Sequence, residues 1–219
     1  MKKFAILFDM DGVIVDNHEF HFLAWQKMCD KYGKPLDHEA YRDHMNGRTL
    51  NEVVEYIFSE PMDPVRIREI GMEKEEIYRE LYQPYLSPTK GLLKLLGDAW
   101  DAGIPMVVGT SAPQPNVRFT IEGLGISHYF QDILDERAVT KGKPNPEIYQ
   151  KCARAAGLPN SQCVVIEDAI SGIRAGQAAG SHVIAVASSH GREELSADLI
   201  IDDFRQLQLK QIEELISTS

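Results

Sequence analysis

The stretch Phe4-Ala5-Ile6-Leu7-Phe8-Asp9-Met10-Asp11-Gly12 decides the fold of this 219-residue chain. Its five consecutive apolar residues are typical of a strand buried on both faces of a sheet, and the acids begin where the strand ends. Similar apolar runs recur at 105–109, 163–166 and 182–186, with a weaker one at 199–201. Helix-like stretches lie between these runs, at 92–102, 146–156 and 171–179. Strands that alternate with helices predict an α/β fold, with a parallel sheet between two helical layers.

Residues 16–84 interrupt this alternation. They contain no apolar run of strand quality and are rich in helix formers, at 19–31, 50–58 and 64–82. In the first of these stretches, the large apolar side chains follow the helical period. We therefore expect two domains: a sheet-containing core made of residues 1–15 and 85–219, and an all-α unit, residues 16–84, inserted after the first strand.

Two local signals refine the helices of the core. Asn145 and Pro146 predict the start of one helix, with Asn145 as the capping residue and Pro146 at the first helical position. Gly172, Gly176 and Gly180 recur at four-residue spacing in another helix. Because glycine permits a close approach of neighbouring chains, this spacing predicts tight packing of that helix on the sheet.

Composition limits the kinds of partner. The net charge is −10, from 23 basic and 33 acidic residues, which argues against a nucleic-acid partner because such proteins usually carry a basic stripe. No targeting signal is visible, and no apolar run approaches the roughly 20 residues that cross a bilayer, so we expect no membrane partner. The three cysteines lack the spacing of a metal site or a redox pair, as expected of reduced thiols in the cytosol. We expect a cytoplasmic protein, and a monomer because no long apolar surface stripe stands out.

Polar residues follow the predicted strands directly, and one lysine precedes the helix that begins near residue 146. These residues are Asp9, Asp11, Thr110, Ser111, Lys143, Glu167 and Asp168. In open α/β sheets, ligands bind beyond the carboxyl ends of the strands, so parallel topology would bring this set to one edge.

The chemistry of this set is coherent. Four carboxylates at one edge would repel each other unless a hard cation joined them, and Mg²⁺ prefers carboxylate oxygens together with phosphate and water. The hydroxyl of Thr110 and the ammonium of Lys143 are donors suited to a phosphoryl group. A carboxylate can also attack phosphorus to form an aspartyl-phosphate. We therefore predict a Mg²⁺ site and a small phosphorylated substrate.

Taken singly, each signal is also compatible with an ordinary structural role. An Asp-x-Asp pair is common in metal-free loops, Thr110 and Glu167-Asp168 are typical helix-capping residues, and lysines such as Lys143 are usually solvated. The order of all four signals, each at a strand end or a helix start, indicates a functional site.

The run Phe8-Asp9-Met10-Asp11-Gly12-Val13, with Thr110, Lys143-Pro144 and Glu167-Asp168, resembles the haloacid dehalogenase-like superfamily over nearly the whole chain. The resemblance implies a Rossmann-like three-layer core with a helical cap domain at residues 16–84. It also implies that Asp9 is the nucleophile, that Asp11 is the acid/base, and that Thr110 and Lys143 hold the phosphoryl oxygens. Asp168 would bind Mg²⁺ with Asp9 and the backbone carbonyl of Asp11, and Glu167 would assist.

Within this superfamily the chain is most similar to β-phosphoglucomutases and their phosphatase relatives. Asp16, His21 and Trp25 match the mutase pattern, and Gly47-Arg48-Thr49 resembles a loop by which such caps select substrates. His21 and Trp25 are four residues apart on one helix face, so a packed structural pair is an equally good interpretation.

The cap departs from the mutase pattern at its basic residues. The expected arginine falls at Leu50, with Arg48 two positions earlier, and the expected lysine falls near Glu80, beside Arg79. We therefore favour a phosphatase acting on a small phosphorylated metabolite, such as a sugar phosphate, with β-phosphoglucomutase as the alternative. A receiver-type signalling domain, phosphorylated on aspartate, is the alternative from a different class, but such domains are shorter and lack an inserted helical unit.

Overall fold

The computed structural model describes residues 3–45 and 49–217. The chain divides into two compact units, a core made of Met1–Asp16 with Leu86–Ser219, and a helical unit, Asn17–Tyr85. Each unit has its own cluster of buried apolar side chains.

The core contains one parallel six-stranded sheet in the order β3-β2-β1-β4-β5-β6. Its strands are β1 (Ala5–Phe8), β2 (Met106–Gly109), β3 (Asp132–Leu134), β4 (Cys163–Glu167), β5 (His182–Val186) and β6 (Leu199–Ile201). All four residues of β1 are buried, as its apolar run predicts. Phe8 pairs with Val108 of β2 and with Ile166 of β4, so these three strands end at the same level.

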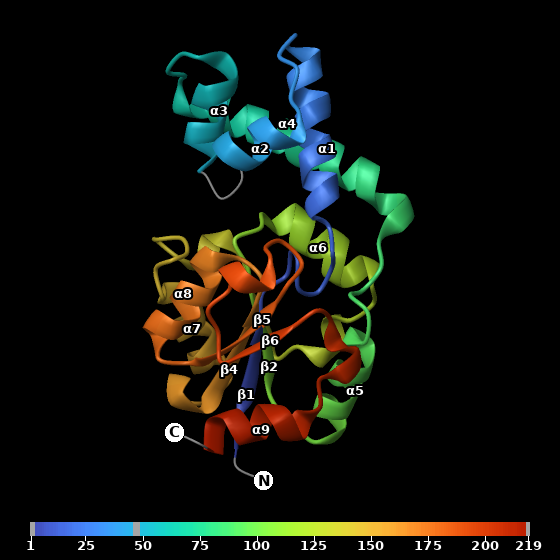
Figure 1. Ribbon diagram of the computed structural model, residues 1–219, viewed down its shortest axis with the longest axis vertical. Helices are drawn as coiled ribbons and strands as arrows, with labels where there is room; N and C mark the ends of the chain where they lie inside the picture. Colours follow the sequence, from blue (N-terminus) through green and yellow to red (C-terminus); the bar gives the residue numbers. More distant parts are fainter. Residues whose placement is uncertain (1–2, 46–48, 218–219) are drawn as a thin grey trace. The chain divides into compact units, whose positions relative to one another are not determined.

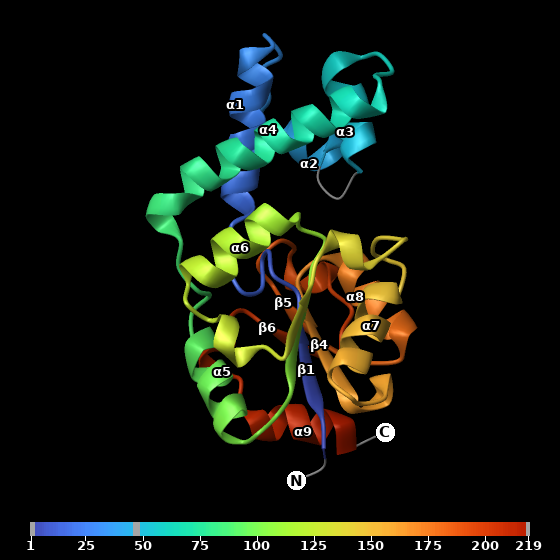
Figure 2. The same ribbon diagram turned by 180° about the vertical axis from the view of Figure 1, so that it is seen from behind.

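Helices cover both faces of this sheet. The core helices are α5 (Leu92–Asp101), α6 (Gln114–Gly123), α7 (Glu147–Ala155), α8 (Ile170–Ala179) and α9 (Leu209–Ser217). Helices α7 and α8 pack on one face, while α5 and α9 lie on the other (Figures 1 and 2). The predicted α/β fold, with a Rossmann-like three-layer core, is therefore confirmed.

Several core elements carry weak signals in the sequence and were not predicted. Strand β3 has three residues, begins with an acid and lies at the edge of the sheet, so it lacks the apolar run of a buried strand. Helix α6 contains Pro115 and ends at Gly123, which weakens its helical signal. Helix α9 follows the last apolar run, so no later strand marks its place in the alternation.

The helical unit consists of α1 (His18–Lys31), α2 (His38–His44), α3 (Leu50–Phe58) and α4 (Pro64–Tyr82), with a short 3-10 turn, Gln83–Tyr85. Helix α1 packs along α4, and their contact buries Phe22, Met28 and Ile70. No strand occurs among its described residues, 17–45 and 49–85. Helix α2 is not among the helices that the sequence predicts.

The two predictions about the helix near residue 146 and the helix with the spaced glycines were partly wrong. Helix α7 begins at Glu147, one residue later than predicted, and Pro146 occupies the capping position. The Asn145 side chain nevertheless accepts a hydrogen bond from the backbone N–H of Glu147. Gly176 does pack tightly, because a Cβ there would lie 3.0 Å from Val183 and 3.2 Å from Val165. Gly180 instead ends α8 in the left-handed conformation, at φ 82°.

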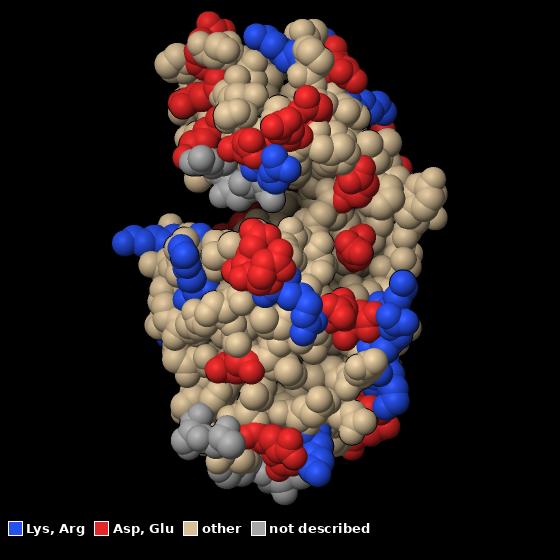
Figure 3. Space-filling view, viewed as in Figure 1, with Lys and Arg blue, Asp and Glu red and all other residues tan. Residues whose placement is uncertain are grey.

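The face of the molecule seen in Figure 3 carries interspersed charges. Lysine and arginine side chains alternate with acidic ones, and no continuous basic stripe is visible among the described residues on this face. Within the described part of the chain, no helix combines the length and apolar character required to cross a membrane.

Two helical glycines provide a test of packing on the sheet. Gly176→Ala should lower the free energy of unfolding by about 0.5–2 kcal/mol, because the added methyl group meets Val165 and Val183 and this outweighs the helical preference of alanine. Gly97→Ala in α5 is the matched control: no atom lies within 4 Å of its added Cβ, so the helical preference of alanine should stabilise the protein by roughly 0.5–1 kcal/mol. Urea unfolding of both variants measures the difference. Equal effects of the same sign would contradict the packing assigned to Gly176.

Candidate active site

Buried polar side chains gather at the carboxyl ends of the central strands. Asp9 follows β1, Thr110 follows β2, and Glu167 and Asp168 stand at the end of β4. Their exposed fractions are only 7%, 2%, 1% and 1%, respectively. The backbone N–H of Asp9 donates to the carbonyl of Ile166 at 2.9 Å, which holds the ends of β1 and β4 together.

Lys143 reaches this edge from the loop that precedes α7. Its ammonium donates to Oδ1 of Asp9 at 2.5 Å and to Oε1 of Glu167 at 2.6 Å. All three side chains are at least nine-tenths buried. The structure therefore brings together residues separated by 134 positions in the chain.

The electrostatics of this cluster are dominated by burial. Burial raises the pKa of Asp9 well above its usual value, Lys143 partly opposes that rise, and the nearby carboxylates of Glu167 and Asp168 add to it. Burial alone would lower the pKa of Lys143, but the carboxylates of Asp9 and Glu167 raise it above its ordinary range. When all are ionised, the three carboxylates exceed the single ammonium by two charges.

The donor set fits a hard divalent cation. Asp9, Glu167 and Asp168 each offer a carboxylate oxygen, and these oxygens all lie within 4.8 Å of one another. Oxygen ligands, an excess of two negative charges and burial are the conditions under which Mg²⁺ binds carboxylates. Asp11 is not part of this side-chain cluster. It lies half-buried in the loop after β1, where Gly12 adopts φ 75°, in the turn that its glycine predicted.

Glu167 is held by four donors. Its Oε1 accepts from Lys143 and from the hydroxyl of Tyr149 at 2.8 Å, and its Oε2 accepts from the backbone N–H groups of Asp168 and Ala169. This carboxylate lies so close to α8 that a Cβ at Gly172 would be 1.7 Å from Oε1. The sequence did not predict Tyr149, because an aromatic residue on an apolar helix face usually indicates core packing. The spacing of Gly172 predicted packing on the sheet, which this contact with the last residue of β4 is, but it did not identify Glu167 as the partner.

The loop carrying Lys143 is organised by Glu147. The carboxylate of Glu147 accepts from the backbone N–H of Thr140 at 3.0 Å, from the Thr140 hydroxyl at 2.9 Å and from the backbone N–H of Lys141 at 3.2 Å. A hydrogen bond from Lys151, followed by those from Thr140, lowers the pKa of Glu147 to about 2. The sequence assigned Glu147 no role in the site, because a glutamate in a first helical turn is common.

Thr110 and Ser111 differ in their surroundings. The Thr110 hydroxyl accepts a hydrogen bond from the backbone N–H of Ala112 at 3.0 Å, so its own hydrogen remains able to donate to a ligand. Ser111, the next residue, is exposed. Their roles toward a substrate stay predictions.

In the helical unit, His21 and Trp25 both face Lys74. The His21 ring stacks on Tyr78 at 4.0 Å, and its Nδ1 lies 2.7 Å from Nζ of Lys74. That ammonium also lies 5.6 Å from the centre of the Trp25 ring. Lys74 is only 4% exposed, yet among the basic residues of α4 the sequence favoured Arg79. A lysine on the apolar face of α4 was the signal that could have identified it.

Of the other residues predicted to bind substrate in the helical unit, the structure describes two, Thr49 and Arg79. Thr49 caps α3, where it exchanges hydrogen bonds with Glu52 in a capping box. Arg79 is half-buried on α4. Gly47 and Arg48 lie outside the described residues. None of these positions tests a contact with substrate, so their substrate-binding roles stay predictions.

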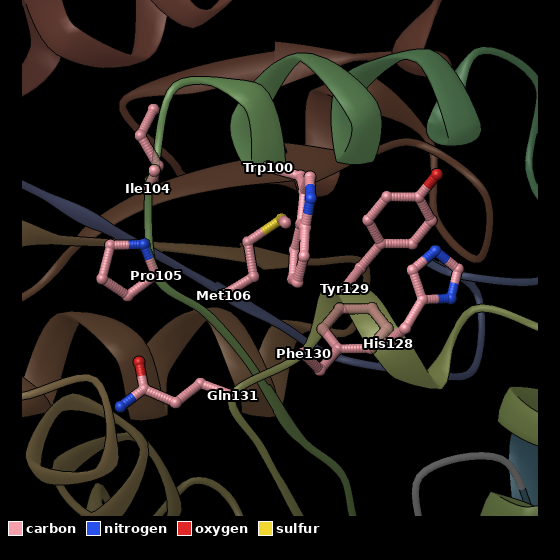
Figure 4. Close-up of a pocket in the computed structure, with 9 residues that line it drawn as sticks. Trp100, Ile104, Pro105, Met106, His128, Tyr129, Phe130 and Gln131 are labelled. Atoms are coloured by element: carbon pink, nitrogen blue, oxygen red, sulfur yellow. The ribbon is translucent and has the colours of Figure 1, made fainter.

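A separate hollow of about 510 Å³ lies where β2 and β3 begin, at the opposite end of these strands from the acids. The rings of Trp100, His128 and Tyr129 border it (Figure 4), with the Trp100 ring 6.0 Å from that of Tyr129. Among the described residues that line it, none is Asp, Glu, Lys or Arg. Its described lining thus offers one imidazole, that of His128, and no carboxylate, ammonium or guanidinium group.

Comparisons with known proteins agree with this geometry. The model of the haloacid dehalogenase-like hydrolase family matches residues 6–186, and the chain belongs to this family. A fructose-1-phosphate phosphatase, YqaB of Escherichia coli, is 30% identical over 83% of this chain and 95% of its own length. The β-phosphoglucomutase of Bacillus subtilis is 29% identical over 96% of this chain and 94% of its own length.

A solved structure shows the same overall likeness. The family IA hydrolase of this type from Entamoeba histolytica superposes with a TM-score of 0.92 at 29% identity, and covers 97% of this chain and 99% of its own. The protein is therefore an enzyme of the haloacid dehalogenase-like phosphatase and phosphomutase kind. No comparison supports the signalling alternative.

Glu147 provides a test of how the Lys143 loop is positioned. Glu147→Ala should lower kcat by about 10- to 100-fold with little change in KM, because a loosened loop misplaces the Lys143 ammonium. Glu147→Gln retains an acceptor oxygen and should lie between this variant and the wild type. Glu122→Ala, at an exposed position of α6, is the matched control.

The pH dependence of stability gives a second readout for Glu147. Because its pKa is lowered on folding, its stabilisation is complete above the ordinary glutamate pKa of about 4.3 and is lost as the pH falls toward 2. The difference in melting temperature between wild type and Glu147→Ala should therefore be constant from about pH 6 to 8 and shrink in acid. A difference that grows in acid would contradict the assigned hydrogen bonds.

Proposed function

We propose that the protein is a Mg²⁺-dependent phosphatase that forms an aspartyl-phosphate on Asp9 and acts on a small phosphorylated metabolite of the sugar-phosphate class. The observation that carries this proposal is the buried cluster in which Lys143 bridges Asp9 and Glu167 beside Asp168. The similarity to phosphatases and a mutase of phosphorylated sugars supports the substrate class.

In the first half-reaction, a carboxylate oxygen of Asp9 bonds to phosphorus while the bond from phosphorus to the ester oxygen breaks. Asp11 gives its proton to that leaving oxygen, which departs as an alcohol. Lys143 and the Thr110 hydroxyl donate hydrogen bonds to the phosphoryl oxygens, whose charge they stabilise. Asp9, Asp168 and the Asp11 carbonyl would hold Mg²⁺, with Glu167 beside them, and the cation would supply further positive charge to these oxygens.

In the second half-reaction, the carboxylate of Asp11 accepts a proton from water as the water oxygen bonds to phosphorus. The bond between Asp9 and phosphorus breaks, inorganic phosphate leaves, and both aspartates return to their starting states. Asp11 therefore acts first as an acid and then as a base.

The helical unit is proposed as the cap that selects the substrate, with residues 16–84 as its extent. Leu50 occupies the position where the mutase pattern has an arginine. Its side chain packs against Gly71 of α4, so closely that a Cβ added to Gly71 would lie 2.6 Å from Cδ2 of Leu50. This position offers no cation for the distal phosphate of a bisphosphate. We therefore place hydrolysis ahead of the mutase reaction, in which a hydroxyl of a sugar phosphate replaces water as the acceptor.

Asp9→Asn tests the nucleophile. The substitution should lower Mg²⁺-dependent release of phosphate from p-nitrophenyl phosphate at least about 1,000-fold, because an amide oxygen cannot form the acyl phosphate. The protein should remain folded, since the amide removes the cost of burying a charge at this position. Asp101→Asn, at the exposed end of α5, is the control. Retained turnover in Asp9→Asn, with an unchanged circular dichroism spectrum, would show that Asp9 is not the nucleophile.

The acceptor is tested by product analysis. With Mg²⁺ and a panel of sugar phosphates, we expect steady release of inorganic phosphate and no isomerised sugar phosphate. ³¹P nuclear magnetic resonance follows both products in one sample. Conversion of β-glucose 1-phosphate to the 6-phosphate, primed by a sugar bisphosphate and faster than phosphate release, would instead establish the mutase.

A further inference from the structure

The loop that follows β5 is tied to both acid-bearing loops by serine hydroxyls. Ser188 donates a hydrogen bond to the backbone carbonyl of Gly12 at 2.7 Å. Its neighbour Ser189 donates to the backbone carbonyl of Asp168 at 3.0 Å. Gly12 directly follows the proposed acid/base, Asp11, and Asp168 is a candidate metal ligand. Ser188 therefore holds the backbone beside the proposed acid/base, and Ser189 holds the backbone of the candidate metal ligand itself.

The sheet order explains why such ties matter. Strand β4 lies between β1 and β5, so the loop after β5 makes no ladder contact with β1. The Ser188 hydroxyl nevertheless links the loop after β5 to the loop after β1, which carries Asp11. The loop after β4, which carries Asp168, belongs to the strand between them. Ladder hydrogen bonds hold strand ends together, but they do not orient the loops beyond them.

The serine loop is itself anchored. The backbone N–H of Ala187 donates to the carbonyl of Ile201 at 2.8 Å, and that of Gly191 donates to the Glu194 carboxylate at 3.0 Å. Nδ1 of His190 lies 2.8 Å from the Ser189 oxygen. Because the single hydrogen of Ser189 is donated to Asp168, we assign the hydrogen of this second contact to His190. The Ser189 hydroxyl is thereby directed at Asp168.

We propose that Ser188 and Ser189 are positioning residues with separate tasks, which rest on the proposed function. Ser188 orients the Asp11 loop for proton transfer to the leaving group, and Ser189 orients the Asp168 loop for binding of the cation. Removing a hydrogen bond that orients a ligand or a catalytic group commonly costs about 10- to 100-fold in metal affinity or activity.

The two tasks predict different losses. Ser188→Ala should lower kcat/KM on a sugar phosphate about tenfold but on p-nitrophenyl phosphate less than about twofold, because kcat/KM reports the phosphorylation of Asp9, in which p-nitrophenolate leaves without needing a proton. Ser189→Ala should weaken Mg²⁺ binding about tenfold, measured by calorimetry on the metal-free protein without substrate. In each variant, threonine in place of alanine should restore most of the loss, since the hydroxyl is retained.

Ser181→Ala is the matched control, because this serine lies just before β5, at its other end, and accepts a hydrogen bond from Asn160. Its ester preference and Mg²⁺ affinity should equal those of the wild type. If Ser188→Ala lowers kcat/KM equally on both esters, or Ser189→Ala leaves Mg²⁺ affinity unchanged, the separate tasks are wrong. The calorimetric result does not depend on turnover, so it stands or falls separately from the proposed phosphatase activity.

Discussion

Carboxylates at the ends of neighbouring parallel strands repel each other, and burial strengthens the repulsion because water no longer screens it. In this protein Asp9, Glu167 and Asp168 share such a position, with Lys143 donating to two of them at 2.5 and 2.6 Å. The ammonium offsets one charge of three and leaves a cluster that attracts further positive charge. A buried excess of negative charge disfavours the folded core by itself, and under the proposed function a divalent cation would offset it.

The surrounding fold supplies the constraints that keep this cluster in place. Tyr149 and two backbone N–H groups donate hydrogen bonds to Glu167, and the absence of a side chain at Gly172 leaves room for its carboxylate. Glu147 ties down the loop that carries Lys143. Because each partner belongs to α7, α8 or the loops beside them, the helical layer on one face of the sheet positions the chemistry at its edge.

Sequence alone predicted the strand ends, because an apolar run that stops at an acid is characteristic of a buried strand in an α/β fold. It did not predict β3, whose three residues carry no apolar run, nor the roles of Tyr149 and Glu147, which look like ordinary helix residues. Lys74 was missed for a related reason: a lysine is expected in solvent, and only the fold shows it 4% exposed beside His21. Contacts made by side chains from distant segments leave no periodicity in the sequence.

Under the proposed function, catalytic chemistry and substrate choice are assigned to different parts of this chain. The acids and Lys143 lie at strand ends and in loops of the core, where under the proposed function they would serve phosphoryl transfer without specifying its substrate. The helical unit offers different chemistry: Leu50 is packed and apolar, whereas Lys74 is buried against His21, Trp25 and Tyr78. A buried lysine persists in such surroundings only when aromatic faces and polar partners offset its desolvation. The helical unit holds this cation among such partners, which include Oε1 of Glu75 at 2.9 Å, so its surroundings differ in kind from those of Leu50.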